Sequence, residues 1–209
     1  MELNQILTFL SASVILSLMP GPDNIFVLTE SVTKGQRNGI AISFGLSTGV
    51  LLHTLAAATG LSIIIQQSDF VFSLLKYLGA AYLFFLAFTT IKEGRPDVEF
   101  GPIGSSGKFK LFSMVKKGFF MNVLNPKVSL FFIAFLPQFV VTNDFQVTLQ
   151  MIVLGVIFMI QSLVVFCGIA CLSGRCSKYI RNDRFWKITK WGKVGVLSIL
   201  GLLLLFSPK

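Results

Sequence analysis

Long apolar stretches separated by short polar segments run along almost the whole chain of 209 residues. A helix needs about 20 apolar residues to cross a hydrocarbon core of about 30 Å, and the hydropathy pattern gives six candidates. They are expected near Ile6–Thr29, Gly39–Gln66, Phe70–Ile91, Gly118–Val140, Gln146–Leu172 and Lys193–Phe206. The pattern therefore predicts an all-α integral membrane protein with six transmembrane helices.

The composition agrees with this pattern. The chain is 54% hydrophobic and only 13% charged, whereas charged residues make up about a quarter of a soluble domain. Its mean hydropathy is +0.78. The first apolar stretch is expected to be a retained helix, because Glu2 stands where a signal peptide carries Lys or Arg.

Basic residues gather in every second segment between the apolar stretches. The first, third and fifth connecting segments are rich in Lys and Arg, whereas the second and fourth carry Asp69 and Asp144 and no basic residue. Cytoplasmic segments of membrane proteins show such an excess of positive charge, so both termini are expected outside. The net charge of +9 then needs no nucleic acid as a partner, and Trp186 and Trp191 between the bases are typical of an anchor at the lipid surface.

The third connecting segment divides the chain into two groups of three helices. We expect a first half at residues 1–91, a cytoplasmic linker at 92–117 and a second half at 118–209, together forming a single transporter domain. Because three is an odd number of spans, the halves would enter the membrane from opposite sides. Any structural likeness between them would therefore be an inverted repeat.

Each half contains a helix-breaking sequence in its first span, "MPGPDN" in one and "VLNPKV" in the other. Proline removes a backbone donor and clashes with the preceding turn, so Pro20, Gly21 and Pro22 predict an unwound segment, and Pro126 predicts a second break. Freed backbone groups inside a membrane must be buried in protein or line a wet cavity. The segment therefore either binds a small polar ligand or is a structural kink whose backbone is satisfied by Ser17 or Asn24.

Two charged residues lie at these breaks. A carboxylate near the centre of a membrane helix costs about 2.5–3.5 kcal/mol and marks a functional position. Asp23 is expected to bind the ammonium group of an amino acid or to carry a proton, and Lys127 would suit a substrate carboxylate. The alternative is an ion pair between Asp23 and Lys127 that holds the halves together. Asn24 and Asn125 are expected to bond broken backbone or to contact substrate.

Further polar and small residues lie within the apolar stretches. His53, the one histidine of the chain, either relays protons or is a neutral ring that hydrogen-bonds a neighbouring helix. Glu30 is expected to be a solvated charge near the cytoplasmic end of its span. Gly45 and Gly49 have the spacing that lets two membrane helices approach closely.

Neither the cysteines nor any other residues indicate a cofactor or a metal. Cys167 and Cys171 lie four residues apart without a neighbouring His or carboxylate that would complete a metal site. We expect them to be small packing residues.

Three longer segments resemble the LysE/RhtB family of amino-acid exporters. They read "PGPDNIFVLTESVTKGQRNGI", "GLSTGVLLHTLAAATGLS" and "GFFMNVLNPKVSLFFIAFLPQF". The resemblance covers nearly the whole chain, and the threonine/homoserine branch of the family looks nearest. The family's motifs fall on Pro20, Gly21, Pro22, Asp23, Asn24, His53, Asn125, Pro126 and Lys127.

The resemblance implies a protein of the bacterial inner membrane that exports amino acids or close derivatives, with neutral threonine- or homoserine-like substrates favoured and the proton-motive force as the driving force. It implies no catalytic residue, so an enzyme is not expected. The partners would be the substrate, protons and the lipid bilayer, and a homo-oligomer is left open. The alternatives are a transporter of another small solute, such as a metal cation, and a membrane scaffold that transports nothing.

Overall fold

The computed structural model describes residues 3–19, 21–61, 69–92, 94, 108–141, 146–180 and 183–206. In this part of the chain the regular elements are helices, and no strand occurs. In chain order they are α1 (Leu3–Leu18), α2 (Pro22–Lys34), α3 (Gln36–Ala56), η1 (Ala57–Leu61), α5 (Asp69–Lys92), α6 (Lys108–Val123), α7 (Pro126–Leu130), η2 (Phe131–Phe135), η3 (Leu136–Phe139), α8 (Val147–Ile180) and α9 (Asp183–Phe206).

The helices provide between four and six membrane spans by their length and composition. Four spans are unbroken and lie within Gln36–Gly60, Ser73–Lys92, Val147–Gly174 and Arg184–Phe206. Two further spans result if each bent pair counts as one: α1 with α2, bent by 58°, and the part of α6 from Leu111 with the segment Pro126–Phe139, bent by 49°. The prediction of an all-helical membrane protein is confirmed, and the two bent pairs are consistent with six spans.

Two helices begin earlier than the sequence pattern predicts. α6 begins at Lys108 rather than near Gly118, and α9 begins at Asp183 rather than at Lys193. The reason is that hydropathy marks the part of a helix that lies in lipid, whereas Lys and Arg are good helix formers that extend a helix into the interface. Much of the basic sequence expected in connecting segments is therefore helical.

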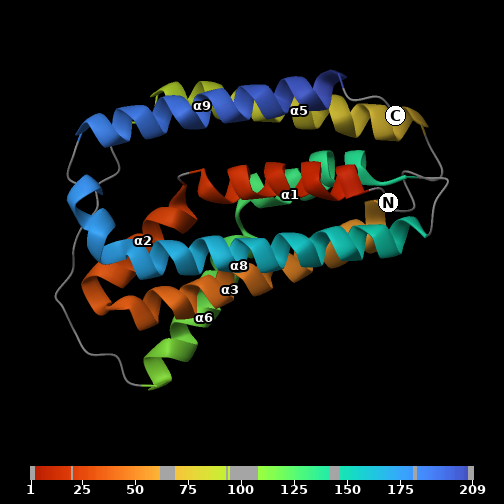
Figure 1. The fold of residues 1–209 in the computed structure, drawn as a ribbon. Helices are drawn as coiled ribbons and strands as arrows, with labels where there is room; N and C mark the ends of the chain where they lie inside the picture. The colour runs from red at the N-terminus through yellow and green to blue at the C-terminus, as the bar shows by residue number, and fades with distance from the viewer. Residues whose placement is uncertain are drawn as a thin grey trace.

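The helices lie in layers (Figure 1). α5 and α9 pack side by side and form one outer layer, in which α5 contacts η2 and α9 contacts α8. α1 lies between this layer and the group formed by α2, α3, α6 and α8. In that group, α3 packs against α6 and α8, and α8 also packs against both α1 and α2. The N- and C-terminal ends lie at the same end of the bundle.

Small residues hold α3 and α6 close together. A Cβ atom at Gly45 would overlap the backbone oxygen of Val115, and one at Gly118 would overlap the backbone oxygen of Ile42. A Cβ at Gly49 would likewise crowd Asn122. The close helix approach predicted at Gly45 and Gly49 is confirmed.

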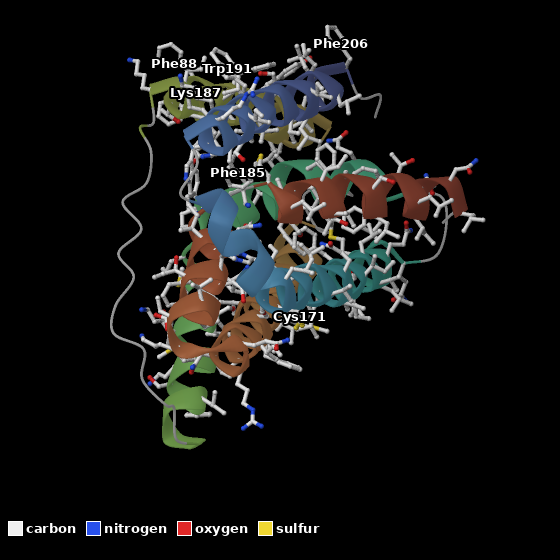
Figure 2. The ribbon with its side chains drawn as sticks, turned by 60° about the vertical axis from the view of Figure 1, so that its left-hand side comes forward. Phe88, Cys171, Phe185, Lys187, Trp191 and Phe206 are labelled. Atoms are coloured by element: carbon white, nitrogen blue, oxygen red, sulfur yellow. The ribbon has the colours of Figure 1, made fainter. Side chains whose placement is uncertain are left out.

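Large apolar side chains cover the outside of the bundle. On the α5–α9 layer, Phe88 is 55% exposed and Trp191 is 60% exposed, and Figure 2 shows both near Lys187 on the side that faces away from α1. Exposed rings of this size would be unfavourable in water but are solvated by lipid. The placement of Trp191 beside basic residues fits the anchor at the lipid surface expected from the sequence.

Candidate polar site at two helix breaks

The first break separates α1 from α2. α1 ends at Leu18, and Gly21 precedes α2 in an extended conformation without any side-chain cap. Pro22 occupies the first position of α2, where its missing N–H costs no hydrogen bond. Pro20 lies outside the described residues, but its lack of an N–H leaves the Leu16 carbonyl oxygen without its partner four residues along the helix.

The second break separates α6 from α7. α6 ends at Val123, and Asn125 caps α7 by accepting a hydrogen bond at Oδ1 from the backbone N–H of Lys127, 3.0 Å away. Pro126 follows at the first position of α7. A break is present at each of the two predicted sequences, and both breaks place a proline at the start of the new helix.

Side chains at each break form hydrogen bonds with residues at the other break. Asn125 donates from Nδ2 to Oδ2 of Asp23 over 2.6 Å, and Asp23 is only 2% exposed. In the opposite direction, Lys127 Nζ lies 3.2 Å from the Leu16 carbonyl oxygen and 3.5 Å from that of Met19. The ammonium group thus occupies the carbonyl end of α1, where a positive charge is favourable. The structure brings Gly21, Asp23, Asn125 and Lys127 into one polar site, in which Lys127 is half-buried and the others are buried.

Asp23 and Lys127 do not form a direct ion pair among the described residues. Asn125 is the hydrogen-bond partner of Asp23, and backbone oxygens of α1 are the partners of Lys127. The two charges remain near enough to interact electrostatically. The ion pair considered for the sequence is therefore replaced by an indirect link through Asn125.

Asn24 satisfies broken backbone, as one of the sequence alternatives expects. Its Nδ2 donates to the Ser17 carbonyl oxygen over 2.8 Å. The same residue of α1 is bonded from a second direction, because Gln161 of α8 donates from Nε2 to Ser17 Oγ over 2.9 Å and also lies 3.3 Å from the Ser13 carbonyl oxygen. Sequence reasoning missed Gln161, although an amide in the middle of a charge-free apolar run is a signal that could have found it.

His53 lies apart from this pair of charges. Its Nε2 is 3.2 Å from the carbonyl oxygen of Asn122, in the last turn of α6. Because a carbonyl oxygen only accepts, Nε2 carries the hydrogen. Of the two roles considered for His53, this contact matches a ring that bonds a neighbouring helix.

Glu30 differs from its expectation. The prediction of a solvated charge is wrong, because Glu30 is only 7% exposed. Its carboxylate pairs with Lys34 one turn along α2, with distances of 2.9 and 3.0 Å. α2 packs against α3 and α8, and the longer Lys34 side chain remains exposed.

The cysteines hold no metal cluster in the part of the chain that the structure describes, where no group of three His, Cys, Asp or Glu side chains gathers. Cys171 is exposed rather than packed (Figure 2), and its Sγ accepts a hydrogen bond from Gln36 Nε2 over 2.9 Å. Cys167 is half-buried. The expectation of packing residues therefore fails for Cys171.

A cavity of about 440 Å³ lies away from the two breaks. Its lining comes from α1, the segment Phe135–Phe139 and the end of α9, and it is almost entirely apolar. Neither Asp23 nor Lys127 contributes to it. The polar site therefore lies at the two breaks and is separate from this cavity.

Comparison with known proteins identifies the family. The model of the LysE type translocator family matches residues 14–207. The homoserine/homoserine lactone efflux protein of Salmonella typhimurium is 30% identical over 196 residues, which cover 94% of this chain and 93% of that protein. An uncharacterized membrane protein of Vibrio cholerae is 28% identical over 99% of this chain and 98% of its own length.

The uncharacterized membrane protein YrhP of Bacillus subtilis is 28% identical over 89% of this chain and 91% of its own length. No solved structure matches the chain significantly. The family match spans both breaks and nearly all helices, and so agrees with the resemblance found in the sequence. The chain is a multi-pass membrane protein of the LysE type translocator family.

Proposed function

We propose that the protein exports small amino acids or close derivatives from the bacterial cytoplasm, by alternating access around the two helix breaks. The observation that carries the proposal is the reciprocal bonding of the breaks: Asn125 bonds Asp23, and Lys127 bonds the end of α1. An opposite pair of charges, with Asp23 buried and Lys127 half-buried, matches the two charged groups of a zwitterionic amino acid. Ligand sites of many transporters lie at such discontinuous helices.

Asp23 takes the ammonium group or a proton, and Lys127 takes the substrate carboxylate. Because Asp23 is 2% exposed, substrate reaches it only after the breaks separate. Substrate binding would replace the hydrogen bonds between the breaks, and their closure would release the substrate. The pair thereby couples substrate binding to the relative position of the two halves.

Small neutral substrates are favoured. The relative from Salmonella typhimurium is named for efflux of homoserine and homoserine lactone, and homoserine carries the ammonium and carboxylate groups that the two charges would bind. The charges that the hydrogen bonds bring together are one carboxylate and one ammonium group, which fits a substrate whose side chain carries no charge.

The proton-motive force supplies the energy in this proposal. One charge that moves across about 100 mV releases about 2.3 kcal/mol, which corresponds to a concentration ratio of roughly fiftyfold at about 1.4 kcal/mol per factor of ten. One proton per neutral amino acid is therefore enough for overflow export. In this proposal the protein lies in the cytoplasmic membrane, and the excess of Lys and Arg in every second connecting segment supports an orientation with both termini outside.

The test is amino-acid efflux from cells loaded with a panel of dipeptides. Cells with the wild type should export one or a few amino acids, homoserine or threonine among them, faster than cells with an empty vector, and a protonophore should abolish the difference. Asp23→Asn should lose this export, because the amide carries neither a proton nor a charge for the ammonium group. Asn125 can still donate to the new side chain, so the fold should be kept.

Glu30→Gln is the matched control. It makes the same chemical change to a second buried carboxylate of α2, whose partner Lys34 lies on the same helix, and it should keep export. Equal efflux in wild type and Asp23→Asn would remove Asp23 from the mechanism. Efflux no faster than the vector over the whole panel would overturn amino-acid export itself.

A further inference from the structure

A second group of buried polar side chains lies next to the two charges, between α1, α2 and α8. It consists of Ser13 and Ser17 of α1, Asn24 of α2 and Gln161 of α8, and we name it the Ser17 cluster. All four residues are at least 93% buried. Ser17 connects them, since it accepts from Asn24 at its carbonyl oxygen and from Gln161 at its hydroxyl.

Two acceptor atoms of this cluster have no partner among the described residues. They are Oδ1 of Asn24 and Oε1 of Gln161, and both are buried. The amide nitrogens of the same two side chains both donate to Ser17, so the orientation of both amide groups is set by this one residue. Buried polar atoms are rarely left without a hydrogen bond, so the cluster is built to receive a donor.

The donor should be neutral. The cluster contains only hydroxyl and amide side chains, so it provides no counter-charge for an ammonium group, whereas the adjacent Asp23 does. The cluster and the two charges lie at the same end of α1, because Lys127 Nζ bonds the carbonyl oxygens of Leu16 and Met19, on either side of Ser17, and Asn24 directly follows Asp23 in the chain. A substrate held at Asp23 by its ammonium group can therefore direct its side chain to the Ser17 cluster.

We propose that the side-chain hydroxyl of the exported amino acid donates its one hydrogen to the unpartnered amide oxygens of Asn24 and Gln161, which share it, and that this pair of oxygens selects hydroxyamino acids over their ethers. This inference rests on the proposed export function and names the part of the site that recognises the side chain. Gln161 is the sharper test residue, because it belongs to an unbroken helix and lies outside the two breaks.

The experiment compares homoserine with its O-methyl ether, which has the same charges but no hydroxyl donor. The full chain is purified and placed in proteoliposomes, and transport of each compound is measured under an imposed proton gradient. Wild type should prefer homoserine by about tenfold, which is the effect of one buried hydrogen bond. Gln161→Met, which keeps the size but removes the acceptor, should bring this ratio close to one while the ether is still transported.

Ser162→Ala is the matched control on the same helix. Ser162 is the next residue of α8, is also buried, and bonds Ser47 of α3 instead of the cluster. It should leave the ratio of the two compounds unchanged. Should Gln161→Met fail to accumulate in the membrane, Asn24→Leu removes the other oxygen and should lower the ratio in the same way.

The outcomes separate this inference from the proposed function. If both compounds are transported and neither Gln161→Met nor Asn24→Leu changes their ratio, the hydroxyl site is overturned. The two oxygens would then bind water, and the proposal of amino-acid export would be unaffected. If the wild type transports homoserine and its ether equally well, the hydroxyl site is also overturned and amino-acid export is unaffected. Wild type that transports none of a wider amino-acid panel would overturn both.

Discussion

Asn125 makes two hydrogen bonds with one side chain, one to the first turn of its own helix and one to Asp23 of the other half. Asn125→Ala would leave the Asp23 carboxylate buried without a partner, which costs about 1–3 kcal/mol. It would also remove the cap of α7, which costs about 1 kcal/mol. We expect a lower midpoint of thermal unfolding, measured by circular dichroism on the purified protein in detergent.

Asn4→Ala is the control for this substitution, because Asn4 is exposed near the start of α1. It should keep the wild-type midpoint. If Asn125→Ala also kept it, the bond between the breaks would contribute nothing to stability, and only a role in transport would remain.

The residues of the site could be found in the sequence, but their partners could not. Proline, carboxylate and lysine within apolar runs mark Asp23 and Lys127 as important whatever the fold. The atoms that they bond depend on the path of the backbone after each break. In the structure Asn125 bonds Asp23, and Lys127 bonds carbonyl oxygens of α1. Gln161 was missed because it is uncharged and stands far from every motif.

At the scale of helices, the contact between α3 and α6 depends on the absence of side chains. Gly45→Ala would drive a methyl group into the backbone of α6 at Val115, which no rotamer change can relieve. Overpacking of this kind costs about 1–3 kcal/mol or more. We expect a lower yield of folded protein and a lower unfolding midpoint, measured by fluorescence-detected size exclusion and by thermal unfolding.

Gly168→Ala makes the same change on α8, at a position where nothing lies within 4 Å of the added carbon. Ala is a better helix former than Gly in a helix interior, so this variant should be at least as stable as the wild type. A similar loss in both variants would show that helix propensity rather than close packing sets the effect at Gly45.

The spans themselves were predictable because lipid imposes a strong and simple pattern, a long apolar helix. Their ends were less so. α6 and α9 extend to Lys108 and Asp183, since a helix does not end where the lipid ends and its last charged turns lie in the interface. The burial of Glu30 likewise depends on how α2 packs within the bundle, which no local pattern reveals.

For the whole molecule, the positive charge of the connecting segments predicts an orientation. The two termini lie at one end of the bundle (Figure 1), and we expect that end to face the periplasm. A C-terminal fusion to a phosphatase that is active only outside the cytoplasm should be active, and a fusion to a cytoplasmic reporter should be inactive. Replacement of Lys34 and Arg37 by Gln gives a variant with less charge bias, which should weaken the preference.

The contacts around the breaks also bear on the inverted halves. His53 bonds a carbonyl oxygen in the last turn before the second break, and Gln161 bonds the end of α1 before the first. An inverted repeat predicts such a parallel, in which the second span of each half supports the broken helix of the other. The repeat itself stays a prediction.

The bond between Asp23 and Asn125 can form only late in the synthesis of the protein, because the two residues are 102 positions apart in the chain. At a synthesis rate of about 5–20 residues per second, Asn125 emerges about 5–20 s after Asp23. During that time Asn125 is not yet available to bond the Asp23 carboxylate. The bond between the two breaks is thus formed late, once the helix that is synthesised fourth has arrived.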